Sequence, residues 1–134
     1  MSNYLPTDYQ AFIHKSRYAK YFDGKGRESW PETVDRYMQN VVLPLLTVAD
    51  EFKDAVYDEL EAAILSLDIM PSMRAMMTAG PALQRDNTAG YNCSYLPVDD
   101  PKAFDEAMFI LLCGTGVGFS VERQYISKLP EVPD

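Results

Sequence analysis

Both cysteines of the chain lie in one stretch, GYNCSYLPVDDPKAFDEAMFILLCGTGVGFSVE, which runs from Gly90 to Glu122. A thiolate can act as a nucleophile, a metal ligand or one half of a redox pair. Cys93 lies between Asn92 and Ser94, whereas Cys113 comes just before the glycine-rich sequence GTGVG. The residues allow three interpretations: a redox site, a phosphate-binding loop, or one piece of a larger catalytic apparatus.

Residue type alone predicts a structural role for both cysteines. Cys93 falls in a predicted strand, where a free cysteine usually packs as a small hydrophobe. Cys113 closes a predicted helix, and the negative end of the helix dipole disfavours a thiolate there. The chain has no C-x-x-C pair, which argues against a stand-alone thiol oxidoreductase. Whether the two cysteines form a disulfide depends on a Cα separation that the sequence does not contain.

The glycines of GTGVG follow a predicted helix and precede a predicted strand. Phosphate loops have the reverse order, because the amides at a helix start attract anions. We therefore expect tight turning, or close approach of another group, in place of phosphate binding. His14, the single histidine, lies in the basic sequence HKSRYAK and is expected at the surface, so the sequence predicts no metal site.

The first half of the sequence predicts three helices. Thr7 with Gln10 forms a capping box before the stretch YQAFIHKSRYAKYF, which is expected to be helical as far as the glycines at 24 and 26. A second box, Ser29 with Glu32, opens a helix that Pro44 interrupts or kinks. Apolar residues at helical spacing predict a third helix over 49–67 with an acidic outer side.

The second half predicts a loop and then a strand, a helix and a strand. MPSMRAMMTAGPALQRDNTAG has no clear period and is expected to be an irregular, partly buried loop. A strand over 91–96 is followed by a helix that starts at Asp100 and Pro101, with a second strand near 117–121. The helix has one predicted apolar face: Phe104, Ala107, Met108 and Leu111. A crossover of this length makes the two strands parallel.

These elements predict an α/β fold in two regions, a helical region over 1–68 and a loop with a strand-helix-strand unit over 69–134. Parallel sheets need both faces covered and more neighbouring strands than this chain supplies. The second region is therefore expected to be the opening of a larger α/β domain.

Composition excludes several classes of partner. The net charge of -8 and the sequence pI near 4.5 argue against nucleic-acid binding. No apolar run reaches the roughly 18 residues that span a bilayer, and the first ten residues lack the pattern of a signal peptide. We expect a cytoplasmic protein that does not bind membranes.

Four motifs, in the order PSMR, TAGP, NCSY and CGTGVGFSVER, resemble the amino-terminal region of adenosylcobalamin-dependent ribonucleoside-triphosphate reductases, the monomeric class II ribonucleotide reductases. The early YQAFIHKSRYAKYFD adds to this resemblance, which extends over nearly the whole chain. It implies a ten-stranded α/β barrel, of which the chain would contain the helical amino-terminal part and the first strand-helix-strand unit.

The resemblance also implies roles for individual residues. Cys93 matches a cysteine of the redox pair that reduces the ribose 2′ position. Ser72 matches a hydroxyl residue near the substrate phosphates, and the backbone at Asn92 and Gly116 matches positions that line the nucleotide. The segment from Val121 to Val132 resembles the start of the contacts with deoxynucleotide effectors, with four candidate residues: Val121, Arg123, Gln124 and Lys128.

The radical cysteine, the second redox cysteine and the cobalamin contacts of such enzymes would all follow Asp134. The resemblance thus implies an amino-terminal fragment, either a split-gene subunit or a truncated product, that is inactive alone. Activity would require the remainder of the barrel, a ribonucleoside triphosphate or diphosphate, adenosylcobalamin and a thioredoxin-type reductant. The alternative is a non-catalytic domain that binds a nucleotide or a protein partner.

Overall fold

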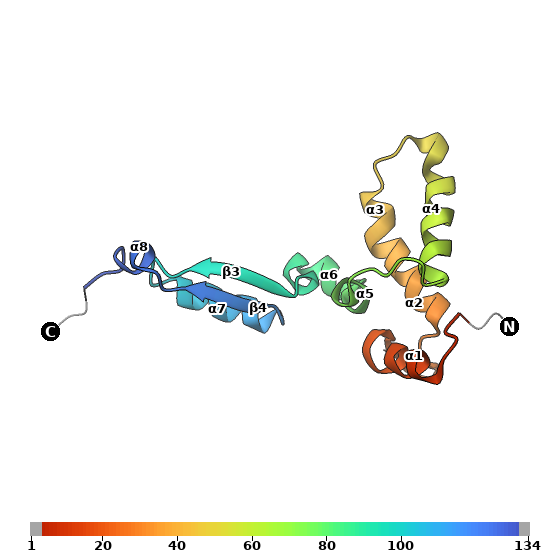
Figure 1. The fold of residues 1–134 in the computed structure, drawn as a ribbon, viewed down its shortest axis with the longest axis horizontal. Coiled ribbons are helices and arrows are strands. Elements are labelled where there is room, and N and C mark those ends of the chain that lie inside the picture. The colour runs from red at the N-terminus through yellow and green to blue at the C-terminus, as the bar shows by residue number, and fades with distance from the viewer. Residues whose placement is uncertain (1–3, 132–134) are drawn as a thin grey trace. The chain divides into compact units, whose positions relative to one another are not determined.

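The computed structural model describes residues 4–131, which divide between Gln84 and Arg85 into two compact units. The domain boundary that the sequence predicts at residue 68 stays a prediction. Helices and strands are both present, which confirms the mixed character of the predicted fold (Figure 1). Among the described residues, no helix is both long and apolar enough to cross a membrane.

The first helix, α1 (Asp8–Ile13), begins with the predicted capping box, in which Thr7 and Gln10 bond each other's backbone N–H. It continues as a π-helical turn, η1 (His14–Tyr18), and then stops. The predicted extension through Tyr21 and Phe22 is wrong, because these two residues form β1 (Tyr21–Phe22). This short strand pairs in antiparallel fashion with β2 (Gly26–Arg27).

Side chains from later in the sequence hold the backbone where the predicted helix would have continued. The guanidinium of Arg27 donates a 2.9 Å hydrogen bond to the carbonyl of Ala19, and the Lys20 N–H donates a 3.0 Å bond to the Glu28 carboxylate. Gly24, with φ of 79°, makes the hairpin turn. Tertiary hydrogen bonds therefore override the local helical pattern.

The second helix starts at the predicted Ser29 capping box and runs as α2 (Trp30–Tyr37), a π-helical turn η2 (Met38–Val42), and α3 (Leu43–Leu45). Pro44 does not end it at once, so of the two predicted alternatives, interruption or kink, the structure agrees with a local irregularity beside Pro44. The widened turn precedes Pro44, where the Leu43 N–H bonds the Met38 carbonyl five residues back. Since proline has no N–H to donate, a change of hydrogen-bond register next to it lets the helix pass.

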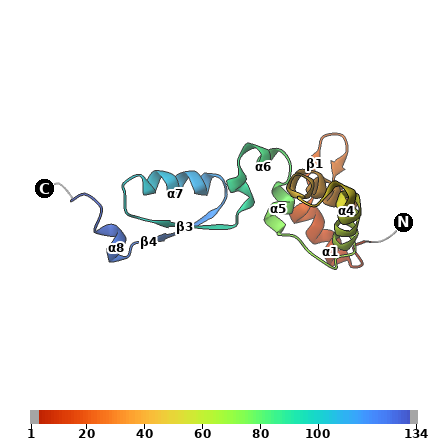
Figure 2. The same ribbon diagram turned by 90° about the horizontal axis from the view of Figure 1, so that it is seen from above.

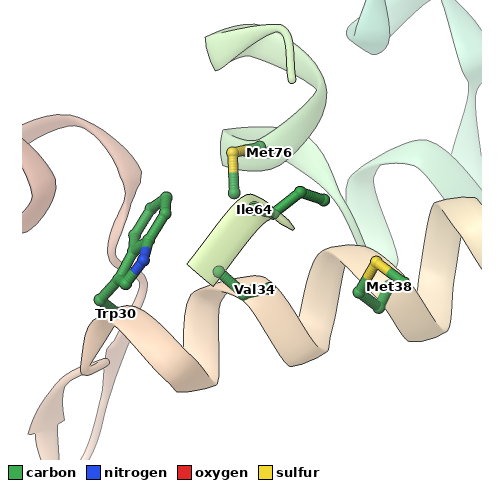
Figure 3. Packing of buried hydrophobic residues seen from close by; sticks show 5 residues of the cluster. All are labelled: Trp30, Val34, Met38, Ile64 and Met76. Atoms are coloured by element: carbon green, nitrogen blue, oxygen red, sulfur yellow. The ribbon is translucent and has the colours of Figure 1, made fainter. Parts of the chain in front are cut away.

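The helix α4 (Asp50–Leu65) confirms the third prediction, with its acidic residues mostly exposed. It packs on α2 and contributes to the core of the first unit. Five side chains form that core, as Figure 3 shows: Trp30, Val34, Met38, Ile64 and Met76. After α4 ends, Leu67 has a φ of 68°, the one positive φ outside glycine in the described chain.

The stretch predicted to be an irregular loop contains two short helices, α5 (Met73–Thr78) and α6 (Pro81–Arg85), which corrects that prediction. The α5 helix packs against α2 (Figure 2). Met76 on α5 is fully buried, whereas Met70 and Met73 are exposed. The sequence showed no helical period here because only one turn of α5 contacts the core.

The second unit has the predicted strand, helix and strand. After a 3₁₀ turn, η3 (Asn87–Gly90), come β3 (Cys93–Pro97), α7 (Ala103–Leu112), β4 (Gly116–Ser120) and a short α8 (Arg123–Ile126). The strands β3 and β4 are parallel, with Cys93 opposite Gly116. Figure 2 shows α7 lying along one side of the two strands. The parallel pairing is confirmed, although α7 starts at Ala103 and not at Pro101.

The apolar face predicted for α7 is present, but most of it does not pack on the sheet. Its large residues point away from the rest of the unit: Phe104 is 65% exposed, and Met108 and Leu111 are also exposed. The side that contacts β3 and β4 instead has Ala103, which is buried, and Ala107 and Ile110, which are half-buried. The α7 helix is therefore apolar on both sides, which is typical of a helix that is buried on both sides.

Candidate functional site

Cys93 begins β3 and lies on an open face of the two-stranded sheet. Side chains alternate along a strand, so Cys93 and Tyr95 share this face with Gly116 and Gly118 of β4, their partners in the register. Cys93 and Tyr95 are both exposed. The expectation of a buried, inert Cys93 is therefore wrong for the described residues, and the thiol is accessible to a second molecule.

Gly116 is in close contact with the Asn92 backbone beside Cys93. Its N–H donates a 2.9 Å hydrogen bond to the Asn92 carbonyl. A Cβ atom at residue 116 would lie 3.4 Å from that same carbonyl oxygen, at the edge of ordinary van der Waals contact. The close approach of another group to this glycine stays a prediction.

Thr115 joins three segments around Cys93, although no sequence motif singled it out. Its side chain is 1% exposed, and its Oγ1 lies 2.7 Å from the Thr88 carbonyl and 2.9 Å from the Tyr91 carbonyl. Its N–H bonds the carbonyl of Ile110 at the end of α7. A threonine between glycines that follow a helix is the available sequence signal, because a hydroxyl there can reach nearby carbonyls.

The predicted end of α7 at Gly114 is confirmed. Gly114 has a φ of 84°, and the N–H groups of Gly114 and Thr115 bond the carbonyls of Leu111 and Ile110. This pattern is the Schellman motif. Cys113 is the last residue before the turn, half-buried, and like Cys93 it is a free thiol.

Ser72 lies in the first unit, at the start of α5, with an exposed side chain that makes no hydrogen bond within residues 4–131. The other end of α5 is held by Arg36, which donates to the carbonyls of Met76 (2.7 Å) and Ala79 (3.0 Å). Lys20 donates to the same Ala79 carbonyl at 2.7 Å. These cations satisfy carbonyls at a helix end and fix the short helix that follows Ser72.

Arg36 is itself fixed by a buried ion pair with Glu28. Its Nε and Nη2 donate to the two carboxylate oxygens of Glu28 at 2.7 and 2.8 Å. Burial raises the pKa of the Glu28 carboxyl. Hydrogen bonds from Arg36, the Lys20 N–H and Thr33 lower it by more than burial raises it, so the pKa lies below its usual value. Glu28 is ionised at neutral pH and the bidentate pair is complete.

The four candidate effector residues lie at the carboxyl end of β4 and beyond it. Val121 and Arg123 are exposed, and an open hollow here is lined by Arg123, Gln124 and two neighbours. Gln124 donates to the Glu122 carboxylate at 2.7 Å, and Lys128 pairs with Asp99 at 3.1 Å. Val132, the end of the predicted effector segment, lies outside the described residues.

A tyrosine pair connects α8 with the strand that contains Cys93. The neighbouring side chain of Tyr95 raises the pKa of Tyr125. Lys128 lies 5.8 Å from the Tyr125 ring. This link was not predicted, because the aromatic residues are 30 positions apart and only the parallel fold brings them together.

Within residues 4–131 no group of three histidine, cysteine or acidic side chains could hold a metal ion. His14 corrects a prediction: it is 4% exposed and not at the surface. Its ring packs edge-on against Trp30 with centroids 5.5 Å apart. The basic sequence around it suggested exposure, but the π-helical turn directs His14 inward while its charged neighbours stay outside.

Comparison with known proteins identifies what this arrangement resembles. No protein-family profile matches the chain. Adenosylcobalamin-dependent ribonucleoside-triphosphate reductases of Lactobacillus delbrueckii subsp. bulgaricus and Lactobacillus helveticus are 29% and 26% identical to it over 89% of the chain. The crystal structure of a B12-dependent, class II ribonucleotide reductase superposes on 91% of the chain with a TM-score of 0.70 and 27% identity. The chain is similar to class II ribonucleotide reductases.

The resemblance inferred from the motifs is thereby confirmed, in sequence and in fold. The chain spans only about a fifth of these reductases: 20% of the curated relatives and 21% of the solved structure. It corresponds to one region of a class II ribonucleotide reductase, with mixed helices and strands. The roles assigned to individual site residues stay predictions.

Proposed function

We propose that this chain forms the part of a class II ribonucleotide reductase that contributes Cys93 as one of two reducing thiols. The observation that carries the proposal is the accessible thiol of Cys93 at the start of β3, opposite a glycine that keeps this face of the sheet open. Similarity to the reductases extends across this same strand-helix-strand unit.

In the proposed reaction the ribonucleotide loses its 2′-hydroxyl as water. Two thiols supply the two electrons and two protons and become a disulfide, so Cys93 needs a second cysteine. Cys113 is half-buried at the far end of α7 and is not proposed for this role. The second thiol and the radical cysteine come from polypeptide beyond these residues, and a thioredoxin-type reductant restores the thiols by exchange.

The proposed contacts with a ribonucleoside triphosphate are Ser72 in the first unit and, taken separately, Asn92 and Gly116 in the second. Support for Ser72 comes from its exposed, unbonded hydroxyl and from the ion pair that fixes α5. At Asn92 and Gly116 support comes from the 2.9 Å hydrogen bond between their backbones beside Cys93. Val121, Arg123, Gln124 and Lys128 are proposed effector contacts, and the open hollow at α8, lined by Arg123 and Gln124, supports two of them.

The relatives are named for adenosylcobalamin, and we propose that the complete enzyme uses this cofactor to generate its radical. The described residues are a poor fit for holding it. The single histidine is buried against Trp30 and bonded to Thr33, so it is not available as a metal ligand. The cofactor would be held by the remainder of the ten-stranded barrel, of which β3 and β4 would be the first two strands.

The experiment combines the 134-residue chain with the remainder of a similar reductase, such as the Lactobacillus delbrueckii enzyme without its matching segment, and measures deoxyribonucleotide formation. Cys93→Ser is expected to abolish multiple turnover with a thioredoxin-type reductant. The loss should be orders of magnitude, because removing one member of a pair that acts as a unit removes the whole effect.

Cys113→Ser is the matched control, since it removes the other thiol of the chain and is expected to retain most of the activity. Equal losses in the two variants would contradict the role of Cys93. Formation of product by the 134-residue chain alone would contradict the need for further polypeptide.

A further inference from the structure

The first unit contains a cavity, partly open to solvent where Tyr9 is 72% exposed, that the proposed reductase function does not use. Its volume is about 220 Å³, larger than the roughly 150 Å³ of a dry cavity that holds benzene. The lining is mostly apolar and comes from α1, η1, the start of α2 and the turn after α4. Six side chains matter here: Tyr9, Ile13, His14, Tyr18, Trp30 and Leu67.

The backbone at this cavity is under strain. Leu67 has left-handed φ at the position where a helix end usually has glycine, and its side chain lines the cavity. A non-glycine residue in this conformation costs about 1–2 kcal/mol. Strained residues of this kind concentrate at ligand-binding positions.

One polar group at the cavity wall has a defined proton arrangement. His14 Nε2 lies 2.9 Å from Thr33 Oγ1, and that hydroxyl donates a 3.0 Å bond to the ionised Glu28. A hydroxyl has one proton, so Thr33 must accept from His14, and the proton of the neutral ring is on Nε2. Burial lowers the pKa of His14 below its usual value, which keeps the ring neutral at pH 7.

The other ring nitrogen, Nδ1, is therefore a bare acceptor. Within residues 4–131 it has no hydrogen-bond partner, although the side chain as a whole is only 4% exposed. His14 lines this cavity and also a second hollow, which it shares with Lys15, Glu28 and Ser29. A buried acceptor without a partner is stabilised when a ligand supplies a hydrogen-bond donor to it.

We propose that this cavity binds a small, neutral aromatic molecule with one hydrogen-bond donor, of the phenol class. Its ring would pack among Tyr9, Ile13 and Trp30, and its donor would bond Nδ1 of His14. An anion such as a nucleotide phosphate has no cationic partner in this lining, so the site is distinct from the proposed substrate and effector contacts. The assignment does not depend on the reductase function.

The test titrates the 134-residue chain with phenol and with toluene, which has nearly the same shape and no donor. Trp30 is the one tryptophan of the chain and lines the cavity, so its fluorescence, excited beyond the absorption band of phenol, reports on binding. Saturable binding of phenol about tenfold tighter than toluene is expected. Equal affinities, or no saturable change with either compound, would overturn the proposal.

Two variants separate the acceptor from the fold. In His14→Gln the side-chain amide can still donate to Thr33 at the place of Nε2, but no acceptor remains at the place of Nδ1. In His14→Asn the amide oxygen takes the place of Nδ1 and the bond to Thr33 is lost. The preference for phenol over toluene should disappear in His14→Gln and persist in His14→Asn. If neither variant folds, the comparison of phenol with toluene in the unaltered chain still decides.

Discussion

The burial and contacts of several residues in this chain are not indicated by their immediate sequence neighbours. His14 lies in a basic sequence yet is buried, and Thr115 lies among glycines yet bonds two carbonyls from another segment. Cys93 shows the reverse: a strand position that predicts burial is exposed. The contacts that determine whether these residues are buried are made with residues distant in sequence, so the local sequence pattern does not predict them.

Leu67 offers a prediction about backbone strain. Leu67→Ala removes the packed side chain but keeps the left-handed penalty of about 1–2 kcal/mol. Leu67→Gly also removes the side chain but avoids that penalty, at an entropic cost of about 0.5–1 kcal/mol. We expect Leu67→Gly to have a free energy of unfolding up to about 1 kcal/mol larger than Leu67→Ala, measured by urea titration.

Ala55, an exposed residue in the middle of α4, is the matched control. Ala55→Gly should lower the free energy of unfolding by about 1 kcal/mol, the usual order of these two residues in a helix. If Leu67→Ala is at least as stable as Leu67→Gly, the left-handed conformation of residue 67 does not carry the predicted strain.

At the scale of elements, the sequence predicted the starts of the first two helices better than their ends. Both capping boxes, at Thr7 and at Ser29, are confirmed, because a cap depends on residues three positions apart. The end of α1 was wrong, because Arg27 and Glu28 decide it, and the π-helical turn before Pro44 was not predicted. The parallel strands were predictable from their crossover length, but the side of α7 that packs on them was not.

That failure has a physical reason. When a helix is apolar all round, periodicity does not distinguish the side that meets its own sheet from the side that meets something else. Phe104, Met108 and Leu111 gave the stronger pattern and are the exposed ones. Of the candidate site, Cys93 and Gly116 were found through the motifs, whereas Thr115 and the Tyr95–Tyr125 link required the fold.

Thr115 leads to a prediction about the junction of η3, β3 and β4. Thr115→Val keeps the shape of the side chain but leaves the carbonyls of Thr88 and Tyr91 without the hydroxyl, at a cost of about 1–3 kcal/mol. The Gly116 amide, which bonds Asn92 across the strands, should then exchange with deuterium about tenfold faster or more. Hydrogen exchange followed by NMR or mass spectrometry measures this.

Thr115→Ser keeps the hydroxyl and loses only a methyl group, so exchange at Gly116 should change much less than in Thr115→Val. Equal acceleration in the two variants would assign the effect to packing, and the hydroxyl would have no special part in holding the turn before Cys93.

At the scale of the whole molecule, the exposed apolar surface of the second unit predicts self-association of the isolated chain. Leu112 is 80% exposed, and Phe104 on α7 and Phe119 on β4 are each more than half exposed. The strands β3 and β4 pair only with each other among the described residues, so each also has an open edge. Sedimentation velocity at increasing concentration should show species larger than the monomer.

A single charge on the outer side of α7 supplies the control. Leu112→Glu alters a side chain with almost no contacts in the unit and should shift the distribution toward monomer. Phe52→Glu, on an exposed position of α4 in the first unit, should have a smaller effect. A compact monomer with a sharp cooperative melt in the unaltered chain would contradict this prediction.

The last prediction concerns nucleotides and follows from how few groups this chain can offer them. The Gly116 N–H is already bonded to Asn92, and Ser72 provides a single hydroxyl. Each hydrogen bond gives about 0.5–1.5 kcal/mol, whereas association alone costs at least about 4 kcal/mol. The net charge of -8 adds repulsion toward a triphosphate. The isolated chain should therefore bind neither a ribonucleoside triphosphate nor a deoxynucleotide effector at up to millimolar concentration.

Isothermal titration calorimetry measures this directly, with the chain alone and with the chain combined with the remainder of a similar reductase. Binding should appear only in the combined sample, because the groups that surround a nucleotide are divided between the two polypeptides. Micromolar affinity for a nucleotide in the isolated chain would exclude such a division. It would instead favour an independent nucleotide-binding domain, whose contacts with the phosphates would then have to come from these residues alone.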